Sequence, residues 1–232
     1  DFVVRDRRAH DGRRYDDDPR VGMLNGSYGG AIQFAVASID PRLDAISPLN
    51  TWNDLAYALA PNNASSRTPG VMKAQWPAGF FAAGLLGLQS GDQSRLGRCP
   101  NYADWVCGGL ASSLARGYPD ADTLARLRHA SVSSYVSRIR IPTLLTQGQH
   151  DTLFNLQEAV ATYEALRTQG TPVRMVWQSA GHSGGGLGTA ETNWDEPEAA
   201  YQSRMELEWF DFWLRGVGDP PPLDFSFFRD WA

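Results

Sequence analysis

The sequence predicts an α/β protein in which a parallel sheet is flanked by helices and interrupted by a helical insert. Short apolar runs typical of strands alternate with longer runs of helical character, and residues 51–130 between them are rich in Trp, Ala, Gly and Pro. Strands that alternate with helices along a chain form a parallel sheet with helices on its faces. The 232 residues, 42% of them hydrophobic, suffice for one such domain with an insert.

The first half of this core is expected over residues 20–50. A charged leader, residues 1–19, precedes it and shows no apolar period, which is typical of a solvated segment. Residues 21–24 (VGML) predict a strand, residues 28–39 a helix and residues 43–49 a second strand.

Residues 51–130 have little strand periodicity and are predicted to be the helical insert. Helices are expected near residues 53–59, 76–88, 102–116 and 120–129. The longest apolar stretch, residues 76–88, is too short and too interrupted by glycine to span a membrane.

The second half of the core is expected over residues 131–216. The predicted elements are a strand at 138–148, a helix at 155–168, a strand at 172–178 and a helix at about 198–214. Asn155 and Glu158 are spaced as a capping box at the start of the first of these helices, and Gly216 is expected to end the last one.

The stretch VGMLNGSYGG places Ser27 where the first strand meets the first helix. A nucleophilic serine of the α/β-hydrolase pattern occupies such a turn, which is so tight that only very small neighbours fit. Gly26, Gly29 and Gly30 supply that smallness. Ser27 is therefore the candidate nucleophile.

A serine nucleophile needs a histidine to take its proton and an acid to orient that histidine. In the α/β-hydrolase pattern these follow in the order Ser, acid, His. Asp151 follows the strand at 138–148 and His182 follows the strand at 172–178, and the ends of parallel strands meet at one edge of a sheet. The other histidines, His10, His129 and His150, lie in the leader, at the end of an insert helix and beside Asp151.

Composition argues against several other classes. The net charge of −5 is not that of a nucleic-acid-binding surface. Scattered histidines and two cysteines make no metal site, and the glycine run GHSGGGLG lacks the spacing of a phosphate-binding loop. A serine hydrolase needs no cofactor. Cys99 and Cys107 are either one disulfide or two buried thiols, which leaves the compartment open between cytoplasmic and exported.

Four motifs together give the chain a family resemblance over residues 20–216: GSYGG, DPRLDAISP, GQHDTLF and GHSG. The chain resembles the Xaa-Pro dipeptidyl-peptidase and cocaine-esterase-like serine hydrolases, the S15 peptidase type. The resemblance implies an α/β-hydrolase fold with the insert as a helical cap. It also implies an acyl hydrolase with Ser27 as nucleophile, His182 as base and Asp151 as orienting acid, and with the backbone N–H of Tyr28 as one oxyanion donor.

The same resemblance implies a longer protein. The family has strands and a second oxyanion donor upstream of the serine turn, and residues 217–232 would be a linker and the start of a downstream β-rich domain. We therefore expect the chain to be truncated at both ends. The aromatic tail, Phe225 to Trp231, is expected to pack on the missing segments or on a second copy of the chain.

The substrate class remains open between an ester, an amide and an X-Pro dipeptidyl bond. Four aromatic residues either line an acyl pocket or form the core of the insert: Trp52, Trp76, Phe80 and Phe81. Asn25, two residues before the serine, is larger than the family pattern, and it crowds the turn unless Gly26 relieves it. The alternative function is therefore a hydrolase-like binding or assembly module whose catalytic site has decayed.

Overall fold

The computed structural model describes residues 12, 18–62, 70–86, 99, 101–184 and 191–229. The chain divides into two compact units, one formed by Asp1–Asn53 with Val132–Ala232 and the other by Asp54–Ser131. Most of the charged leader and the end of the aromatic tail, including Trp231, lie outside the described residues. In the part of the chain that is described, no helix is long and apolar enough to cross a membrane.

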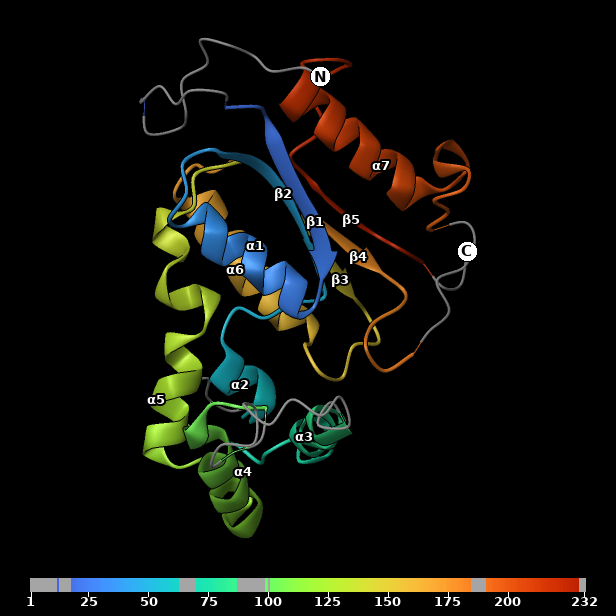
Figure 1. The fold of residues 1–232 in the computed structure, drawn as a ribbon. Helices are drawn as coiled ribbons and strands as arrows, with labels where there is room; N and C mark the ends of the chain where they lie inside the picture. Colours follow the sequence, from blue (N-terminus) through green and yellow to red (C-terminus); the bar gives the residue numbers. More distant parts are fainter. Residues whose placement is uncertain are drawn as a thin grey trace. The chain divides into compact units, whose positions relative to one another are not determined.

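The larger unit holds a five-stranded sheet in which every neighbouring pair is parallel (Figure 1). Its strands follow one another in sequence order: β1 (Val21–Gly26), β2 (Leu43–Leu49), β3 (Thr143–Gly148), β4 (Val173–Gln178) and β5 (Phe225–Phe227). The predicted parallel α/β architecture is confirmed. Strand β5, at the start of the aromatic tail, adds an edge strand that the sequence analysis does not anticipate.

Helices cover both faces of this sheet (Figure 1). On one face, α1 (Tyr28–Ala37) and α6 (Leu156–Thr168) pack against a core that includes Phe34, Ile46 and Leu166. On the other face, α7 (Tyr201–Phe210) contributes Met205 and Trp209 to a cluster with Leu144 and Val176. Alternate residues of β3 and β4 therefore face opposite helix layers, as the strand pleat requires.

The start of β3 and the cap of α6 differ from the sequence prediction. Val136–Arg138 forms a 3₁₀ turn, and the strand begins only at Thr143. Asn155 does cap α6, because its side chain accepts the N–H of Gln157. Glu158, however, does not complete a capping box: it accepts the backbone N–H of Asn53 at 2.6 Å. Glu158 instead joins α6 to the chain segment that follows β2.

The last helix is also less regular than expected. Pro197–Ala199 forms a separate 3₁₀ turn before α7, and a π-helical segment, Asp211–Arg215, continues α7. Gly216 follows in the left-handed conformation and ends the helix, as the sequence predicts.

All the regular secondary structure described in the smaller unit is helical. Its helices are α2 (Leu55–Leu59), α3 (Gln75–Leu86), α4 (Asp104–Arg116) and α5 (Ala121–His129). Ala56, Leu124 and Leu127 form its buried core, and a disulfide joins Cys99 to Cys107. Residues 87–88, which the sequence assigns to the helix of α3, lie outside the described residues.

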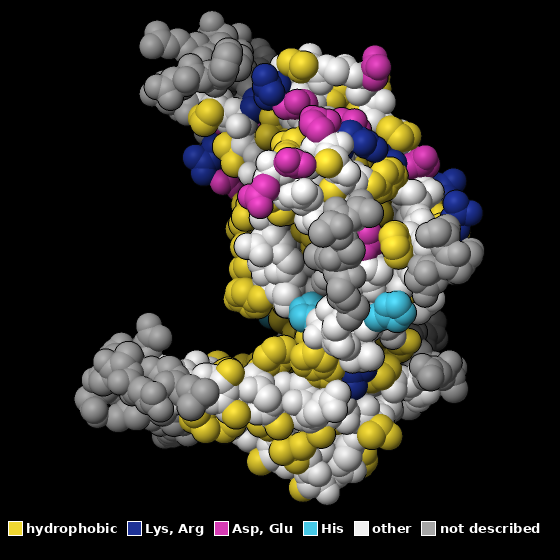
Figure 2. Space-filling model, turned by 90° about the vertical axis from the view of Figure 1, so that its right-hand side faces the viewer, with side chains coloured by type: hydrophobic (Ala, Val, Ile, Leu, Met, Phe, Trp, Pro, Cys, Tyr) yellow, Lys and Arg dark blue, Asp and Glu magenta, His cyan; other side chains and the backbone are white. Residues whose placement is uncertain are grey.

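Acidic and basic side chains lie next to one another on the surface of the larger unit (Figure 2). Several of them form ion pairs, such as Arg174 with Asp224 and Arg215 with Asp211. Within the described ranges, no three His, Cys, Asp or Glu side chains are grouped so that they could hold a metal ion.

Candidate active site

Ser27 occupies the single residue between the end of β1 and the start of α1. Its backbone has φ 56° and ψ −125°, a conformation that residues with side chains rarely adopt. Two sets of hydrogen bonds hold this turn: the Ser27 N–H donates to the carbonyl of Leu49 at 2.8 Å, and the Ser27 carbonyl accepts from Gly30 and Ala31. The turn thus has the strained strand-to-helix geometry of a nucleophile elbow.

Two glycines after Ser27 are closely packed against their neighbours. A Cβ on Gly30 would lie 3.0 Å from the Thr51 Cβ, and one on Gly29 would lie 2.7 Å from the Asn25 Cγ. Asn25 therefore occupies the space that the missing Cβ of Gly29 leaves free. Its Oδ1 accepts the N–H of Gly26 at 2.7 Å, so the expected crowding by Asn25 is relieved within the turn.

Tyr28 is the first residue of α1. The first backbone N–H groups of a helix have no intrahelical acceptor, so the Tyr28 N–H is oriented like the other orphan donors at this end. Its side chain is exposed, and its ring lies 6.4 Å from the ring of Trp52. This is the position that the sequence analysis gives to one oxyanion donor.

Asp151 lies in the loop after β3, and its side chain is buried. One carboxylate oxygen, Oδ1, accepts the backbone N–H groups of Leu153 and Phe154, both at 2.9 Å. The other oxygen, Oδ2, lies 2.6 Å from His182 Nδ1 and also accepts the His182 N–H at 3.2 Å. Each oxygen therefore has two donors, which fixes the carboxylate plane.

His182 lies in the loop after β4 with 18% of its side chain exposed. A carboxylate oxygen only accepts hydrogen bonds, so Nδ1 carries the proton and Nε2 keeps a lone pair. The imidazole and the Phe154 ring form a T-shaped pair with a centroid distance of 5.2 Å and an interplanar angle of 90°. Gly181 allows the loop to pack this closely, because a Cβ there would lie 2.5 Å from the Asp151 Cβ.

The three predicted residues follow the carboxyl ends of three strands of the same parallel sheet, β1, β3 and β4. Gly26 of β1 is paired with Leu49 of β2, and Gly148 of β3 with Gln178 of β4. A row of aromatic contacts runs along this edge, from Tyr28 to Trp52 at 6.4 Å and from Trp52 to Phe154 at 5.2 Å, and then to His182. Ser27, Asp151 and His182 thus lie at one edge of the sheet, the usual place for a site in a parallel α/β fold.

The predicted pocket residues are divided between the two units. Trp52 is 7% exposed and belongs to the larger unit, where Tyr28 and Phe154 flank it. Trp76, Phe80 and Phe81 lie on α3 of the smaller unit. The rings of Trp76 and Phe80 lie 5.9 Å apart, and Phe81 stacks on Tyr102.

Several residues around His182 have roles that sequence reasoning misses. The hydroxyl of Ser183 accepts the N–H of Thr152 at 3.0 Å and also contacts its Oγ1, so it joins the two loops that carry Asp151 and His182. Phe154 contacts the imidazole. These contacts join residues about thirty positions apart, and only the order of the loops along the sheet edge hints at them.

The sequence matches a family described as X-Pro dipeptidyl-peptidase (S15 family) over residues 12–184. The chain belongs to this family. The match confirms the resemblance carried by the four motifs, and it includes the serine turn, the insert and both loops that hold Asp151 and His182. A search of curated protein sequences finds no match.

Solved structures with a similar fold are also found. An acylaminoacyl peptidase of Pyrococcus horikoshii superposes with a TM-score of 0.50 and 13% identity, over 89% of this chain and 26% of that protein. An esterase of Pyrococcus furiosus gives a TM-score of 0.45 and 16% identity, over 84% and 54% of the two chains. The S15 chain spans about a quarter of the length of the acylaminoacyl peptidase. At these identities the likeness concerns the α/β-hydrolase fold.

Proposed function

We propose that this S15-family chain carries the catalytic residues of a serine hydrolase that cleaves an ester or amide bond. Ser27 is the nucleophile, His182 the general base and acid, and Asp151 the orienting carboxylate. The observation that carries the proposal is the 2.6 Å contact between His182 Nδ1 and Asp151 Oδ2, at the same sheet edge as the strained Ser27 turn.

The reaction follows from these groups. The Ser27 Oγ attacks the substrate carbonyl carbon while its proton passes to the lone pair on His182 Nε2. Asp151 stabilises the imidazolium so formed through the Nδ1–H bond. The same proton then goes to the departing alcohol or amine, which leaves an acyl group on Ser27, and a water activated by His182 releases the acid and restores the serine.

The Tyr28 N–H is proposed as one donor to the oxyanion that forms on the substrate. Helix α1 begins at this residue, so its N-terminal dipole also favours negative charge there. Loss of one such donor typically costs about 3 kcal/mol of transition-state stabilisation.

Within this class, cleavage after an X-Pro dipeptide is the finer proposal, and it rests on the family match. Such a substrate needs an acidic group for its free amino terminus. Of the acidic residues of the smaller unit, Asp54 caps α2 and Asp122 pairs with Arg126. Asp54 thus has a structural role, whereas the exposed Asp122 and Asp104 stay candidates for binding that amino terminus.

Reaction with a fluorophosphonate, followed by peptide mass spectrometry, tests the proposal directly. We expect an adduct on Ser27 in the chain or in a longer form that includes upstream segments, and no adduct in the His182→Ala variant. Absence of labelling in both forms would favour the alternative, a binding or assembly module. For the substrate, Ala-Pro p-nitroanilide is compared with its N-acetylated form and with p-nitrophenyl acetate; X-Pro dipeptidyl cleavage requires that acetylation abolish turnover of the anilide.

A further inference from the structure

Glu191 is a buried carboxylate that the proposed reaction does not use. It is 5% exposed and lies beyond the glycine-rich stretch that follows His182. Its Oε1 accepts the backbone N–H of Ser179 at 2.9 Å, and its Oε2 accepts the hydroxyl of the same serine. One carboxylate therefore satisfies both donors of a single residue at the end of β4.

Ser179 is held on its remaining side as well. Its carbonyl lies 3.0 Å from His150 Nδ1, which must be the donor because a carbonyl only accepts. Glu191 is in turn connected to α7, since its backbone carbonyl accepts the backbone N–H of Gln202 at 2.8 Å. Ser179 is thus fixed at its N–H, its hydroxyl and its carbonyl.

The segment from Ser179 to His182 has little freedom to absorb a displacement. Ser179 lies three residues before His182, and Gly181 between them is packed against Asp151 so closely that a Cβ would lie 2.5 Å from the Asp151 Cβ. A shift at the start of this segment is therefore expected to change the distance between His182 Nδ1 and Asp151 Oδ2.

We propose that Glu191 is a positioning residue for His182, acting through its two hydrogen bonds to Ser179. Hydrogen bonds to a charged group are about twice as strong as those between neutral groups, and loss of Glu191 would remove both of the bonds that hold Ser179 to it. The expected effect of Glu191 on the reaction rate rests on the proposed function. Its effect on the contact between His182 and Asp151 is independent of any activity.

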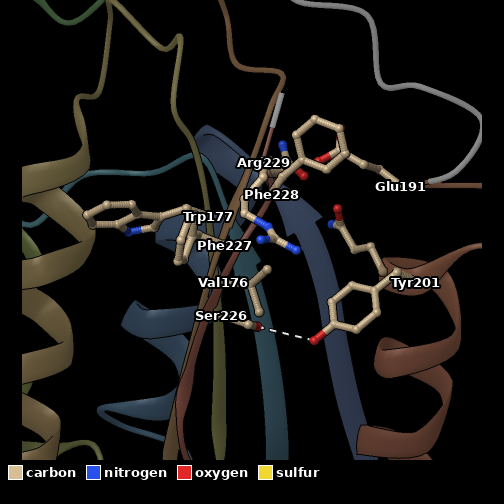
Figure 3. A pocket seen from close by; sticks show the side chains of 10 residues that line it. Val176, Trp177, Glu191, Tyr201, Ser226, Phe227, Phe228 and Arg229 are labelled. Atoms are coloured by element: carbon tan, nitrogen blue, oxygen red, sulfur yellow. Dashed lines mark hydrogen bonds between the residues drawn. The ribbon is translucent and has the colours of Figure 1, made fainter. Parts of the chain in front are cut away.

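A pocket beside Glu191 bears on the choice of variant. Glu191 lines a cavity of about 440 Å³ together with residues of β4, β5 and α7. Figure 3 shows that the Tyr201 hydroxyl points at Ser226, to which it donates a hydrogen bond at 3.3 Å. Removal of the Glu191 side chain opens onto this space, where water can reach the Ser179 donors. The Glu191→Ala variant is therefore expected to fold.

The test compares Glu191→Ala with Glu191→Gln, and uses Glu196→Ala, an exposed glutamate nearby, as the matched control. The glutamine can still accept the Ser179 N–H and can donate to its hydroxyl. The readout is the downfield imidazole proton resonance of His182 Nδ1–H, assigned by its absence in His182→Asn. We expect Glu191→Ala to broaden or lose this resonance, and the other two variants to keep it.

The same variants are assayed with an activated ester. Since a misplacement of about 1 Å can cost on the order of 100-fold in rate, Glu191→Ala should lower kcat about 10- to 100-fold with little change in KM, and Glu191→Gln should restore most of it. A folded Glu191→Ala protein with the wild-type resonance and wild-type kcat would overturn the proposal. Failure of Glu191→Gln to restore either readout would also overturn it, because the charge and not the two bonds would then matter.

The two proposals fail in different ways. If the wild-type protein hydrolyses no ester, the proposed function fails, while the His182 resonance still decides the role of Glu191. If Glu191→Ala does not yield folded protein, Ser179→Ala replaces it, since this variant loses the hydroxyl bond and keeps the N–H bond to Glu191. The positioning role would then be contradicted if the His182 resonance is unchanged in Ser179→Ala and is lost in Glu191→Gln.

Discussion

His182 and Asp151 are joined twice through one atom, because Asp151 Oδ2 accepts both the imidazole Nδ1–H at 2.6 Å and the His182 backbone N–H at 3.2 Å. The side-chain bond selects the tautomer of the imidazole, and the backbone bond fixes the position of the His182 main chain from which the ring extends. The opposite oxygen of Asp151 is held by two further N–H groups of its own loop. The orientation of the imidazole is therefore set by a carboxylate that its own loop holds through two hydrogen bonds.

This arrangement predicts a large effect of Asp151→Asn. The amide offers an N–H group as well as an oxygen, so it can hold His182 in the tautomer that has no lone pair on Nε2. We expect kcat with an activated ester to fall about 10⁴-fold, as is typical when a triad aspartate becomes an amide, with the fold preserved. Steady-state kinetics together with circular dichroism check this. A decrease below tenfold would separate Asp151 from the reaction.

Ser27→Ala and His182→Ala should each reduce kcat by orders of magnitude, and the double variant should be little worse than either one. The reason is that the serine and the histidine act in the same proton transfer and are not independent contributors. Measurement of kcat for the four proteins tests this. Additive losses in the double variant would show that the two residues act separately.

Gly181→Ala should disturb the site through packing alone. The added Cβ would lie 2.5 Å from the Asp151 Cβ, so either the loop or the acid must move. We expect at least a tenfold loss of kcat, of the size that small displacements of catalytic groups produce. Gly108→Ala is the matched control, because a Cβ there meets no atom within 4 Å. Equal kcat in both variants would contradict the close packing.

The serine turn predicts a coupling between Asn25 and Gly29. An alanine at Gly29 would meet the Asn25 side chain at 2.7 Å, although alanine favours a helix by about 1 kcal/mol over glycine. Gly29→Ala should therefore destabilise the protein alone and be tolerated when Asn25→Gly is present. Urea unfolding of the four proteins should give a coupling free energy of about 1–3 kcal/mol. Additive effects would mean that the two side chains do not compete for space.

Glu206 of α7 predicts a pH dependence of stability. The residue is 1% exposed, and burial raises the pKa of its carboxyl from 4.5 to about 7, although a hydrogen bond from Gln202 opposes the rise. Because the folded state binds this proton more tightly than the unfolded state, its contribution to stability is present below about pH 4.5 and is lost as the pH rises toward 7.

The Glu206→Gln variant isolates this contribution. A difference of this size in pKa corresponds to about 3 kcal/mol. The free energy of unfolding of the wild type should therefore fall by about this amount, relative to that of Glu206→Gln, as the pH rises from about 4.5 to about 8. Above the raised pKa the difference between the two proteins should level off. Chemical unfolding at several pH values measures it. A constant difference across this range would show that the carboxyl has an ordinary pKa.

The sequence by itself determined the α/β class, the order of the elements and the places of three candidate residues after strand ends. These features depend on local patterns: apolar periodicity, small residues beside Ser27, and the chain order in which Asp151 and His182 follow their strands. Such patterns persist whatever the neighbouring elements do. The family resemblance rested on the same short motifs.

The tertiary structure decided which side chains meet. Glu158 fits a local capping box by its spacing, yet it accepts the N–H of Asn53, which lies far away in sequence. Likewise, the spacing of Glu191 and Ser179 in the sequence does not predict their two hydrogen bonds. Backbone donors become available only where loops pass one another, and a carboxylate binds the donors that burial leaves unsatisfied, because leaving them unpaired costs more than any local preference gains.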